Sequence, residues 1–314
     1  MRLINCLTLE LEEFFGSNIP PYAILSHTWG NDEVTFLELP LSTPATQARA
    51  GYRKIEFTCQ QAIRDKLNYA WVDTCCIDKR SSSELSEAIN SMFAWYRDAS
   101  YCYAYLSDVL EEEMGEHFHK SRWFTRGWTL QELLAPRDVE FYNCQWHWLG
   151  RKSGHSKLIS EITGIDVTAL MGTRARCHAN GGMFGDHCVA KRMSWASTRE
   201  TTRTEDMAYC LLGIFNINLP LLYGEGDRAF RRLQEEIIRR VNDDSILAWG
   251  PRLDIKRQTE PLFKYFKDTI IYKNASLNIL AKSPKDFTDC GDLEYAINPI
   301  TPPTLTTLGL TIQL

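Results

Sequence analysis

Three polar clusters in the first half of the chain contain the residue types that could do chemistry. They are Ser26-His27-Thr28-Trp29-Gly30, Asp73-Thr74-Cys75-Cys76-Ile77-Asp78 and Arg126-Gly127-Trp128-Thr129-Leu130-Gln131-Glu132. Each of the first two directly follows an apolar run that is typical of a strand. Because ligands of open parallel sheets bind at the carboxyl ends of the strands, we expect residues 26–30, Asp73 and Glu132 to converge on one cleft.

The third cluster combines an aromatic ring with a carboxylate. Trp128 and Glu132 are four residues apart, so they share one face of a helix. Such a pair suits a flat ligand that develops positive charge during a reaction. A structural interpretation stays open, because most helical glutamates are solvated surface groups and tryptophans are more often core residues than ligand platforms. His27 and Asp73 would then only form hydrogen bonds in loops.

Other patterns have simpler explanations than the sites they suggest. Cys177-His178 and His187-Cys188 offer four zinc ligands, but adjacent residues rarely both reach one tetrahedral metal, and a glycine-rich loop fits better. Residues 224–229 match G-x-G-x-x-A, yet Glu225 would face the phosphates with the wrong charge, so a helix start fits better. A nucleophilic thiol next to His27 is a further alternative, although cysteines at the end of a buried strand usually serve packing.

Strand-like and helix-like patterns alternate through the first half of the chain. The expected strands are residues 22–26, 69–73, 101–106 and 139–142. The expected helices are residues 55–67, 84–99 and 128–134, and Ser81 with Glu84 fits a capping box before the second. Strands separated by helices predict an α/β fold with a parallel sheet flanked by helices.

The sequence pattern of the remaining residues predicts two further structural units. Residues 145–200 show no regular pattern, whereas residues 204–215 and 225–242 have helical patterns, the latter with an apolar face that needs a partner surface. Residues 245–314 are typical of short strands and turns. We therefore expect one domain at 1–150, a mainly helical extension at 151–250 and a β-rich segment at 251–314. The last ends in a strand-like run, so we expect that the chain continues in a longer protein or comes from a truncated gene model.

Composition and charge narrow the class of protein. The 314 residues are 44% hydrophobic and 24% charged, as in ordinary globular proteins. The net charge of −5 is concentrated in residues 1–140, which have 21 Asp/Glu against 13 Lys/Arg, so a nucleic-acid partner is not expected. The ten cysteines have no regular spacing and the chain begins without an apolar signal sequence, so we expect a cytoplasmic protein with reduced thiols. The charge-free stretch 207–224 contains glycine, asparagine and proline, and predicts a buried helix and turn rather than a membrane span.

Together, the three clusters resemble the hallmark motifs of the fungal HET (heterokaryon incompatibility) domain in order and in spacing. The resemblance covers roughly residues 20–150, and residues 192–249 resemble the region that commonly follows this domain. It implies an effector that triggers programmed cell death when genetically different hyphae fuse. Some HET proteins also contain a nucleotide-binding sensor, but this sequence has no G-x-x-x-x-G-K-S/T motif.

The HET domain is in turn similar to TIR domains, which implies a TIR-like (flavodoxin-like) fold for residues 1–150. The third cluster resembles the TIR helix with the catalytic glutamate, and Trp128 and Glu132 match its tryptophan and glutamate, while Thr129 stands where TIR sequences often have cysteine. Catalytic TIR domains cleave the nicotinamide–ribose bond of NAD, and a carboxylate stabilises the oxocarbenium-like ribose that results. The resemblance thus implies Glu132 as catalytic residue and the following substrate-binding residues: Ser26, His27, Trp29, Gly30, Asp73 and Trp128.

Two main functions remain open from the sequence, beside a structural or regulatory protein with a decayed site, which the intact motifs oppose. The first is an NAD glycohydrolase that uses NAD or a related nucleotide as substrate and needs no cofactor or metal. The second is a non-catalytic signalling scaffold that associates with itself or with a sensor or receptor protein. Neither function predicts a nucleic-acid or membrane partner.

Overall fold

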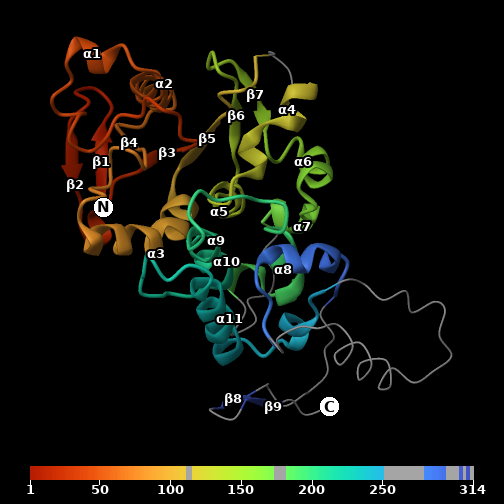
Figure 1. The fold of residues 1–314 in the computed structure, drawn as a ribbon. Coiled ribbons are helices and arrows are strands. Elements are labelled where there is room, and N and C mark those ends of the chain that lie inside the picture. Colours follow the sequence, from red (N-terminus) through yellow and green to blue (C-terminus); the bar gives the residue numbers. More distant parts are fainter. Residues whose placement is uncertain (111–114, 173–181, 251–278, 295–303, 307–308, 312–314) are drawn as a thin grey trace.

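The computed structural model describes residues 1–110, 115–172, 182–250, 279–294, 304–306 and 309–311 (Figure 1). Seven strands form one mixed sheet in the order β2-β1-β4-β3-β5-β6-β7. The strands are β1 (Arg2–Asn5), β2 (Leu11–Glu13), β3 (Tyr22–His27), β4 (Tyr69–Trp71), β5 (Tyr101–Tyr105), β6 (Glu140–Tyr142) and β7 (Trp148–Arg151).

Four central strands are parallel, as the alternating pattern predicts. β3 pairs with β4 on one side and with β5 on the other, and β5 pairs with β6. All six residues of β3 are buried, which is typical of a parallel strand covered on both faces. Numbered along the chain, these four strands have the spatial order 2-1-3-4, so the direction of the crossovers reverses between β3 and β5. Ligands of open α/β sheets bind at such a switch point.

The antiparallel strands at both edges of the sheet were not predicted from the sequence. β1 runs antiparallel to β2 and β4, and β7 runs antiparallel to β6. These edge strands have three or four residues, and none of the residues of β2 is buried. Such short segments show too little alternation to be recognised, because their pairing depends on partners that lie far away in the sequence.

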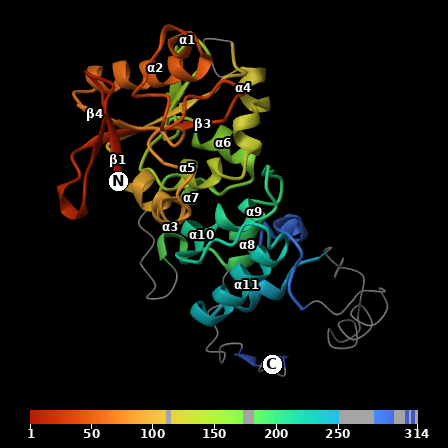
Figure 2. The same ribbon diagram turned by 60° about the vertical axis from the view of Figure 1, so that its left-hand side comes forward.

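Helices cover both faces of the sheet, and Figure 2 shows α2 on one side of β3 and α3 with α5 on the other. The helices of this part are α1 (Pro44–Gln47), α2 (Ala50–Arg64), α3 (Ser82–Asp98), α4 (Glu116–Lys120) and α5 (Thr129–Leu134). Ser81 caps α3 by accepting a hydrogen bond from the backbone N–H of Glu84. The Glu84 carboxylate binds Arg2 and the Asp78 N–H instead of completing the predicted capping box.

The described residues between 151 and 250 form helices, so the region expected to be irregular up to residue 200 contains regular structure. These are α6 (Ser156–Thr163), α7 (Val167–Leu170), α8 (Val189–Ser194), α9 (Asp206–Tyr209), α10 (Leu212–Phe215) and α11 (Arg228–Arg240). Left-handed residues end two of them, Gly164 after α6 and Asn216 after α10. The apolar face of α11 is buried as expected, through Phe230, Leu233 and Ile237.

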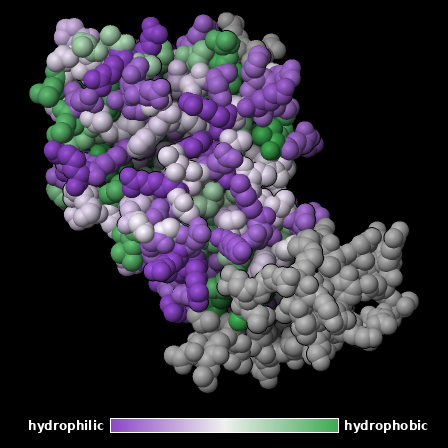
Figure 3. Space-filling view, viewed as in Figure 1, coloured by the Kyte–Doolittle hydropathy of each residue, from purple (hydrophilic) through white to green (hydrophobic). Residues whose placement is uncertain are grey.

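The C-terminal part is described only in pieces. The described residues include the short 3₁₀ helices η4 (Asp244–Leu247) and η6 (Pro284–Cys290). They also include an antiparallel pair of strands, β8 (Thr304–Thr306) and β9 (Gly309–Thr311). Much of the segment expected to be β-rich lies outside the described residues. None of the described helices has both the length and the apolar composition of a membrane span. On the face shown in Figure 3, hydrophobic residues form small separate patches among hydrophilic ones.

Candidate functional site

Glu132 lies buried at the carboxyl edge of the parallel sheet, beside the last residues of β3. Ser26 donates a hydrogen bond to Glu132 Oε2 at 2.5 Å, and Trp123 Nε1 donates one to the Ser26 hydroxyl at 2.9 Å. Tyr96 of α3 lies next to the carboxyl group and donates its own hydroxyl to the Leu25 carbonyl. We call Glu132, Ser26, Trp123 and Tyr96 the Glu132 network.

Burial changes the acidity of this carboxyl group. Glu132 is only 6% exposed. Desolvation raises the pKa of Glu132 to about 8 despite the hydrogen bond from Ser26, and the negative charge of Asp73 adds to the rise. At neutral pH the protonated form therefore predominates in the free protein.

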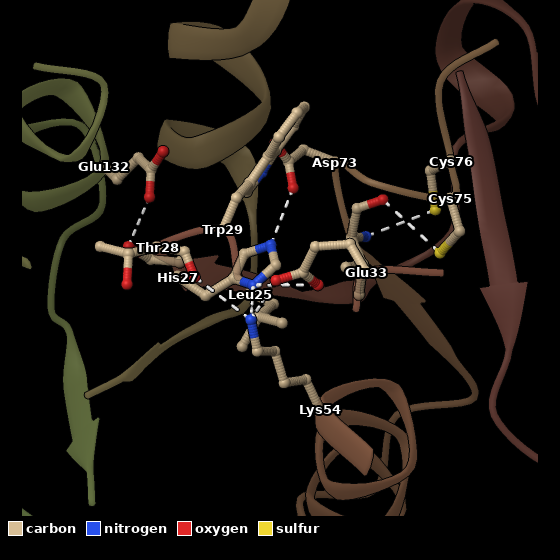
Figure 4. A network of polar contacts seen from close by, with 12 residues as sticks. Leu25, His27, Thr28, Trp29, Glu33, Lys54, Asp73, Cys75, Cys76 and Glu132 are labelled. Carbon is tan, nitrogen blue, oxygen red and sulfur yellow. Dashed lines mark hydrogen bonds and ion pairs between the residues drawn. The ribbon is translucent and has the colours of Figure 1, made fainter. Parts of the chain in front are cut away.

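A second network surrounds Asp73 at the end of β4 (Figure 4). His27 Nε2 lies 2.9 Å from Asp73 Oδ1, and Trp29 Nε1 donates to Asp73 Oδ2 at 2.8 Å. On the other side of the imidazole, Lys54 Nζ lies 3.2 Å from His27 Nδ1 and also binds Glu33. We call Asp73, His27, Trp29, Lys54 and Glu33 the Asp73 network.

The partners of His27 determine its tautomer. The Lys54 ammonium group can only donate, so His27 Nδ1 accepts and the ring proton lies on Nε2, from which it is donated to Asp73. Glu33 Oε2 lies 4.0 Å from His27 Nδ1 and makes no hydrogen bond within the described residues. The imidazole is thus held from both sides in one orientation.

Asp73 is the strongly acidic group of the site. Burial alone would raise its pKa, but the charge of Lys79 and the hydrogen bonds from His27 and Trp29 lower the pKa of Asp73 to about 2. The Lys79 ammonium also lies 3.4 Å from the centre of the Trp29 ring. Asp73 is therefore ionised, whereas Glu132 is mainly protonated, at the same edge of one sheet.

The two networks lie on opposite faces of the sheet because Ser26 and His27 are consecutive residues of β3. Side chains alternate along a strand, so Ser26 points towards α5 and Glu132 while His27 points towards Lys54 of α2. The single cleft expected from the sequence is therefore divided between two faces. The networks approach each other at the strand ends, where the Asp73 charge acts on Glu132.

The remaining candidate residues have different surroundings. Trp29 is half exposed at the rim of the Asp73 network. The backbone N–H of Gly30 donates to Glu33 Oε1 at 2.7 Å, so Gly30 belongs to the loop that supports Lys54. Trp128 precedes α5, and its side chain lies next to the carboxyl group of Asp206 in α9, so this ring packs against the helical extension.

The other sequence patterns have structural roles in the described residues. Cys75 is buried, and burial raises the pKa of its thiol well above the usual range, which opposes a nucleophilic role. Glu205 accepts hydrogen bonds from the N–H groups of Gly224 and Gly226, so a carboxylate already occupies the position that a phosphate would need. Cys177 and His178 lie outside the described residues, and among those described no cluster of three or more potential ligands could hold a metal.

Several supporting residues were not predicted from the sequence. Lys54 lies within the buried side of α2, next to Ile55 and one turn before Thr58, and a lysine among buried positions is the signal that could have revealed it. Trp123 lies in the 3₁₀ helix η2 (Arg122–Thr125) and is completely buried. Its role could not be predicted, because its hydrogen bond to Ser26 spans 97 residues.

Comparisons with known proteins identify the family of the chain. Residues 22–118 match the family model described as heterokaryon incompatibility protein (HET), a range that includes the first two clusters and ends before the third. Residues 228–308 match a domain of unknown function, DUF8212. The vegetative incompatibility protein HET-E-1 of Podospora anserina is 47% identical over 255 residues, which is 77% of this chain but 18% of that protein. No solved structure matches the chain. The chain is therefore a heterokaryon incompatibility (HET) domain protein.

Proposed function

We propose that this chain is the effector part of a vegetative incompatibility response and that its HET domain cleaves NAD, with Glu132 as the catalytic residue. The observation that carries the proposal is the position of Glu132, a buried carboxyl group at the carboxyl edge of the parallel sheet, close to the switch point between β3 and β5. The likeness to HET-E-1, a protein named for vegetative incompatibility, supports the biological role.

The strand order supports a TIR-like fold for the domain. The order 2-1-3-4 of the parallel strands is the order in which flavodoxin-like sheets begin. TIR domains share that type of sheet, and Glu132 follows Trp128 at the spacing of the TIR glutamate motif. The antiparallel edge strands β1, β2 and β7 would then be additions outside this common part.

The proposed reaction uses the charge of Glu132. The bond between C1′ of the ribose and the pyridinium nitrogen breaks, its electron pair stays with nicotinamide, and the ribose becomes an oxocarbenium-like cation that the carboxylate stabilises. Water then adds to C1′ and releases a proton, giving ADP-ribose. The pyridinium of NAD is itself positive, so its approach would favour ionisation of Glu132, whose pKa in the free protein is about 8.

The neighbouring residues would have distinct tasks. Ser26 would be a positioning residue, because it fixes one carboxyl oxygen of Glu132 and is itself fixed by Trp123. Trp29 would offer a half-exposed ring at the rim, with Lys79 above it. His27, Gly30 and Asp73 would hold this rim in place rather than touch the reacting bond.

A scaffold function is the second candidate, and the burial of Glu132 favours it. A carboxyl group that is 6% exposed, mostly protonated and hydrogen-bonded to Ser26 has the properties of a structural core residue. In that case the domain would act by associating with itself or with a receptor, and Glu132 would only connect α5 to β3.

The test compares Glu132→Gln with Glu161→Gln, a matched change at an exposed position on α6. Purified full-length chain at high concentration is incubated with NAD, and nicotinamide release is measured. We expect Glu132→Gln to reduce release at least 100-fold while Glu161→Gln behaves like the parent, since a pre-organised charge contributes about 3–4 kcal/mol to such a barrier.

Cell death on overexpression provides a second readout. If killing requires NAD cleavage, it disappears with Glu132→Gln and persists with Glu161→Gln, while both variants remain folded. If the folded Glu132→Gln variant kills as well as the parent, the catalytic assignment is wrong and the scaffold function replaces it. If the parent kills without releasing nicotinamide, the NAD proposal is rejected as well.

A further inference from the structure

A buried arginine of the helical extension lies beside α5, the helix of the HET site. Arg199 follows α8 and is 1% exposed. Its Nη1 donates to the Arg126 carbonyl at 2.8 Å and to the Thr129 hydroxyl at 3.0 Å, so it holds the residues at the start of α5. The backbone N–H of Glu200 donates to the Thr125 carbonyl at 2.7 Å, which attaches the same segment to the HET domain.

A chain of hydrogen bonds that passes through Trp123 connects Arg199 with Glu132. The Thr129 hydroxyl, which accepts from Arg199, donates to the Trp123 carbonyl at 2.5 Å. The indole N–H of Trp123 donates to Ser26, and Ser26 donates to Glu132. All five residues are buried. Arg199 therefore helps to hold the carboxyl group of Glu132 in place without touching it.

The guanidinium group also acts on Glu132 through its charge. It faces Thr129, Cys210 and Glu132, and its Nη2 is buried and makes neither a hydrogen bond nor an ion pair with the described residues. Burial lowers the pKa of Arg199 to about 10, so the group is still a cation at neutral pH. A buried cation without an ion pair is costly, and ionisation of Glu132 would compensate it. Arg199 accordingly lowers the pKa of Glu132, against the larger effect of burial.

The other titratable groups around Glu132 limit how a change of pH can be interpreted. Asp73 is ionised throughout the neutral range, because its pKa is about 2. Lys152 donates to two carbonyls at the end of α5, and its pKa of about 8 lies in the range of interest, so only variants that retain Lys152 are compared. Burial raises the pKa of three further groups, which therefore stay neutral: Tyr96, Cys102 and Cys210.

We propose that Arg199 is a positioning residue of the HET site, which fixes the Glu132 network and favours the carboxylate over the carboxylic acid. The inference rests on the proposed function, because it takes the carboxylate as the active form in NAD cleavage. Arg199 makes no hydrogen bond to Glu132 within the described residues, so it supports the charge without occupying a carboxyl oxygen. Since Arg199 lies outside the first 150 residues, the site is complete only with the helical extension in place.

Two variants of the full chain separate the charge of Arg199 from its packing. Arg199→Gln removes the charge and Arg199→Lys keeps it, while both lose the guanidinium fork. Arg192→Gln is the matched control, because Arg192 is also 1% exposed in the extension, but its guanidinium lies 4.7 Å from the centre of the Phe215 ring. Thermal unfolding shows which variants are folded, and Arg199→Met replaces Arg199→Gln if the latter is not.

The first readout is the pH profile of kcat/KM for nicotinamide release. Without the nearby cation Glu132 ionises at higher pH, so the rise of the profile should move up by about half a pH unit or more in Arg199→Gln. Release at pH 7 then falls at least about threefold. Arg199→Lys should stay closer to the parental midpoint, and Arg192→Gln should keep it. A purely structural role would lower the rate of both Arg199 variants without moving the midpoint, and that result overturns the proposal.

A further variant tests the hydrogen-bond chain alone. Thr129→Val keeps the charge of Arg199 but interrupts the connection to Trp123, so it should lower the plateau of the profile without moving its midpoint. Release equal to that of the parent would overturn the positioning role, even if no neutral variant of Arg199 folds.

A stability measurement addresses Arg199 independently of NAD cleavage. Because the pKa of Glu132 is raised on folding, stability falls as pH rises, and a still higher folded pKa enlarges that fall. Urea unfolding at pH 5 and pH 9 should therefore show a larger fall in Arg199→Gln than in Arg199→Lys, and the difference should vanish when Glu132→Gln is also present. Equal falls overturn the proposal. A larger fall in a chain that releases no nicotinamide supports the action of Arg199 on Glu132 and rejects NAD cleavage alone.

Discussion

At the scale of single residues, the two acidic groups of the site have opposite environments. Asp73 is surrounded by donors and by the charge of Lys79, whereas the pKa of Glu132 is dominated by its burial, which outweighs the hydroxyl groups of Ser26 and Tyr96 beside it. The protein therefore maintains one ionised and one protonated carboxyl group at the same sheet edge. Groups with such separated pKa values often occur at functional sites, and each shift has a consequence for stability.

Glu132→Gln is expected to stabilise the fold at alkaline pH. The pKa of Glu132 rises from 4.5 to about 8 on folding, so between these values only the unfolded chain ionises and stability falls as pH rises. The loss amounts to something on the order of 5 kcal/mol by pH 9, and the variant should avoid it. Urea unfolding of the parent, Glu132→Gln and Glu161→Gln at pH 5 and pH 9 measures the difference. An equal pH dependence in all three would show that the carboxyl group is solvated.

The rate of NAD cleavage should depend on the same ionisation. If the carboxylate stabilises the ribosyl cation, the active form of the free protein increases about tenfold per pH unit below 8 and then levels off. The pH profile of kcat/KM for nicotinamide release at constant ionic strength checks this. A profile that is flat from pH 6 to pH 9 would mean that ionisation of Glu132 does not limit the reaction.

Asp73 should make the protein sensitive to acid. Its pKa falls from 3.8 to about 2 on folding, so its contribution is complete above pH 4 and is lost as pH falls towards 2. The loss is roughly 2 kcal/mol. In Asp73→Asn this part of the acid transition should be missing, and the fold should be less stable at pH 6, because His27 and Trp29 lose a charged acceptor. Thermal unfolding from pH 2 to pH 6 tests both effects.

The sequence alone indicated which polar residues lie at the ends of strands, but not which residues form hydrogen bonds with them. The pairing of Ser26 with Glu132 spans 106 residues and that of His27 with Asp73 spans 46, so neither distance follows from spacing. The assignment of both pairs to one cleft overlooked the alternation of Ser26 and His27 along β3.

At the scale of elements, alternating patterns predicted the four parallel strands and the helices between them. Residues 101–106 became β5 (Tyr101–Tyr105), and residues 84–99 became α3 (Ser82–Asp98), because apolar periodicity is strong in both. The predicted helix at 204–215 is instead interrupted between α9 and α10. No proline or glycine precedes that interruption, so tertiary packing sets it rather than a local signal.

The close contact between the start of α2 and the loop after β3 leads to a prediction about the stability of the fold. A Cβ at Gly51 would lie 2.4 Å from the Asp32 carbonyl oxygen and 2.6 Å from the Glu33 Cα, so Gly51→Ala must displace the backbone next to Lys54. We expect a loss of about 1–3 kcal/mol. Gly154→Ala is the matched control, because its nearest neighbour would be 3.7 Å away. Denaturant unfolding that gives equal stabilities for both variants would contradict this contact.

At the scale of the whole molecule, the helical extension packs directly on the HET domain. Asn90 of α3 exchanges two hydrogen bonds with the backbone of Leu219, each at 3.1 Å. The backbone N–H of Gly127 donates to the Glu200 carbonyl at 2.9 Å, which joins the start of α5 to the segment that carries Arg199. The sheet, the helix of Glu132 and the extension therefore share one set of contacts, and we expect them to unfold together.

Gly213→Ala tests that expectation at a close contact between the two parts. A Cβ at Gly213 in α10 would lie 2.2 Å from the Phe93 Cβ of α3, so the helices must separate. Overpacking of this kind costs about 1–3 kcal/mol. If the parts form one cooperative unit, the variant lowers the midpoint of a single transition, and far-ultraviolet circular dichroism and tryptophan fluorescence still coincide. Two separate transitions, with the HET domain unfolding at the parental midpoint, would instead show that the extension is dispensable for the stability of the site.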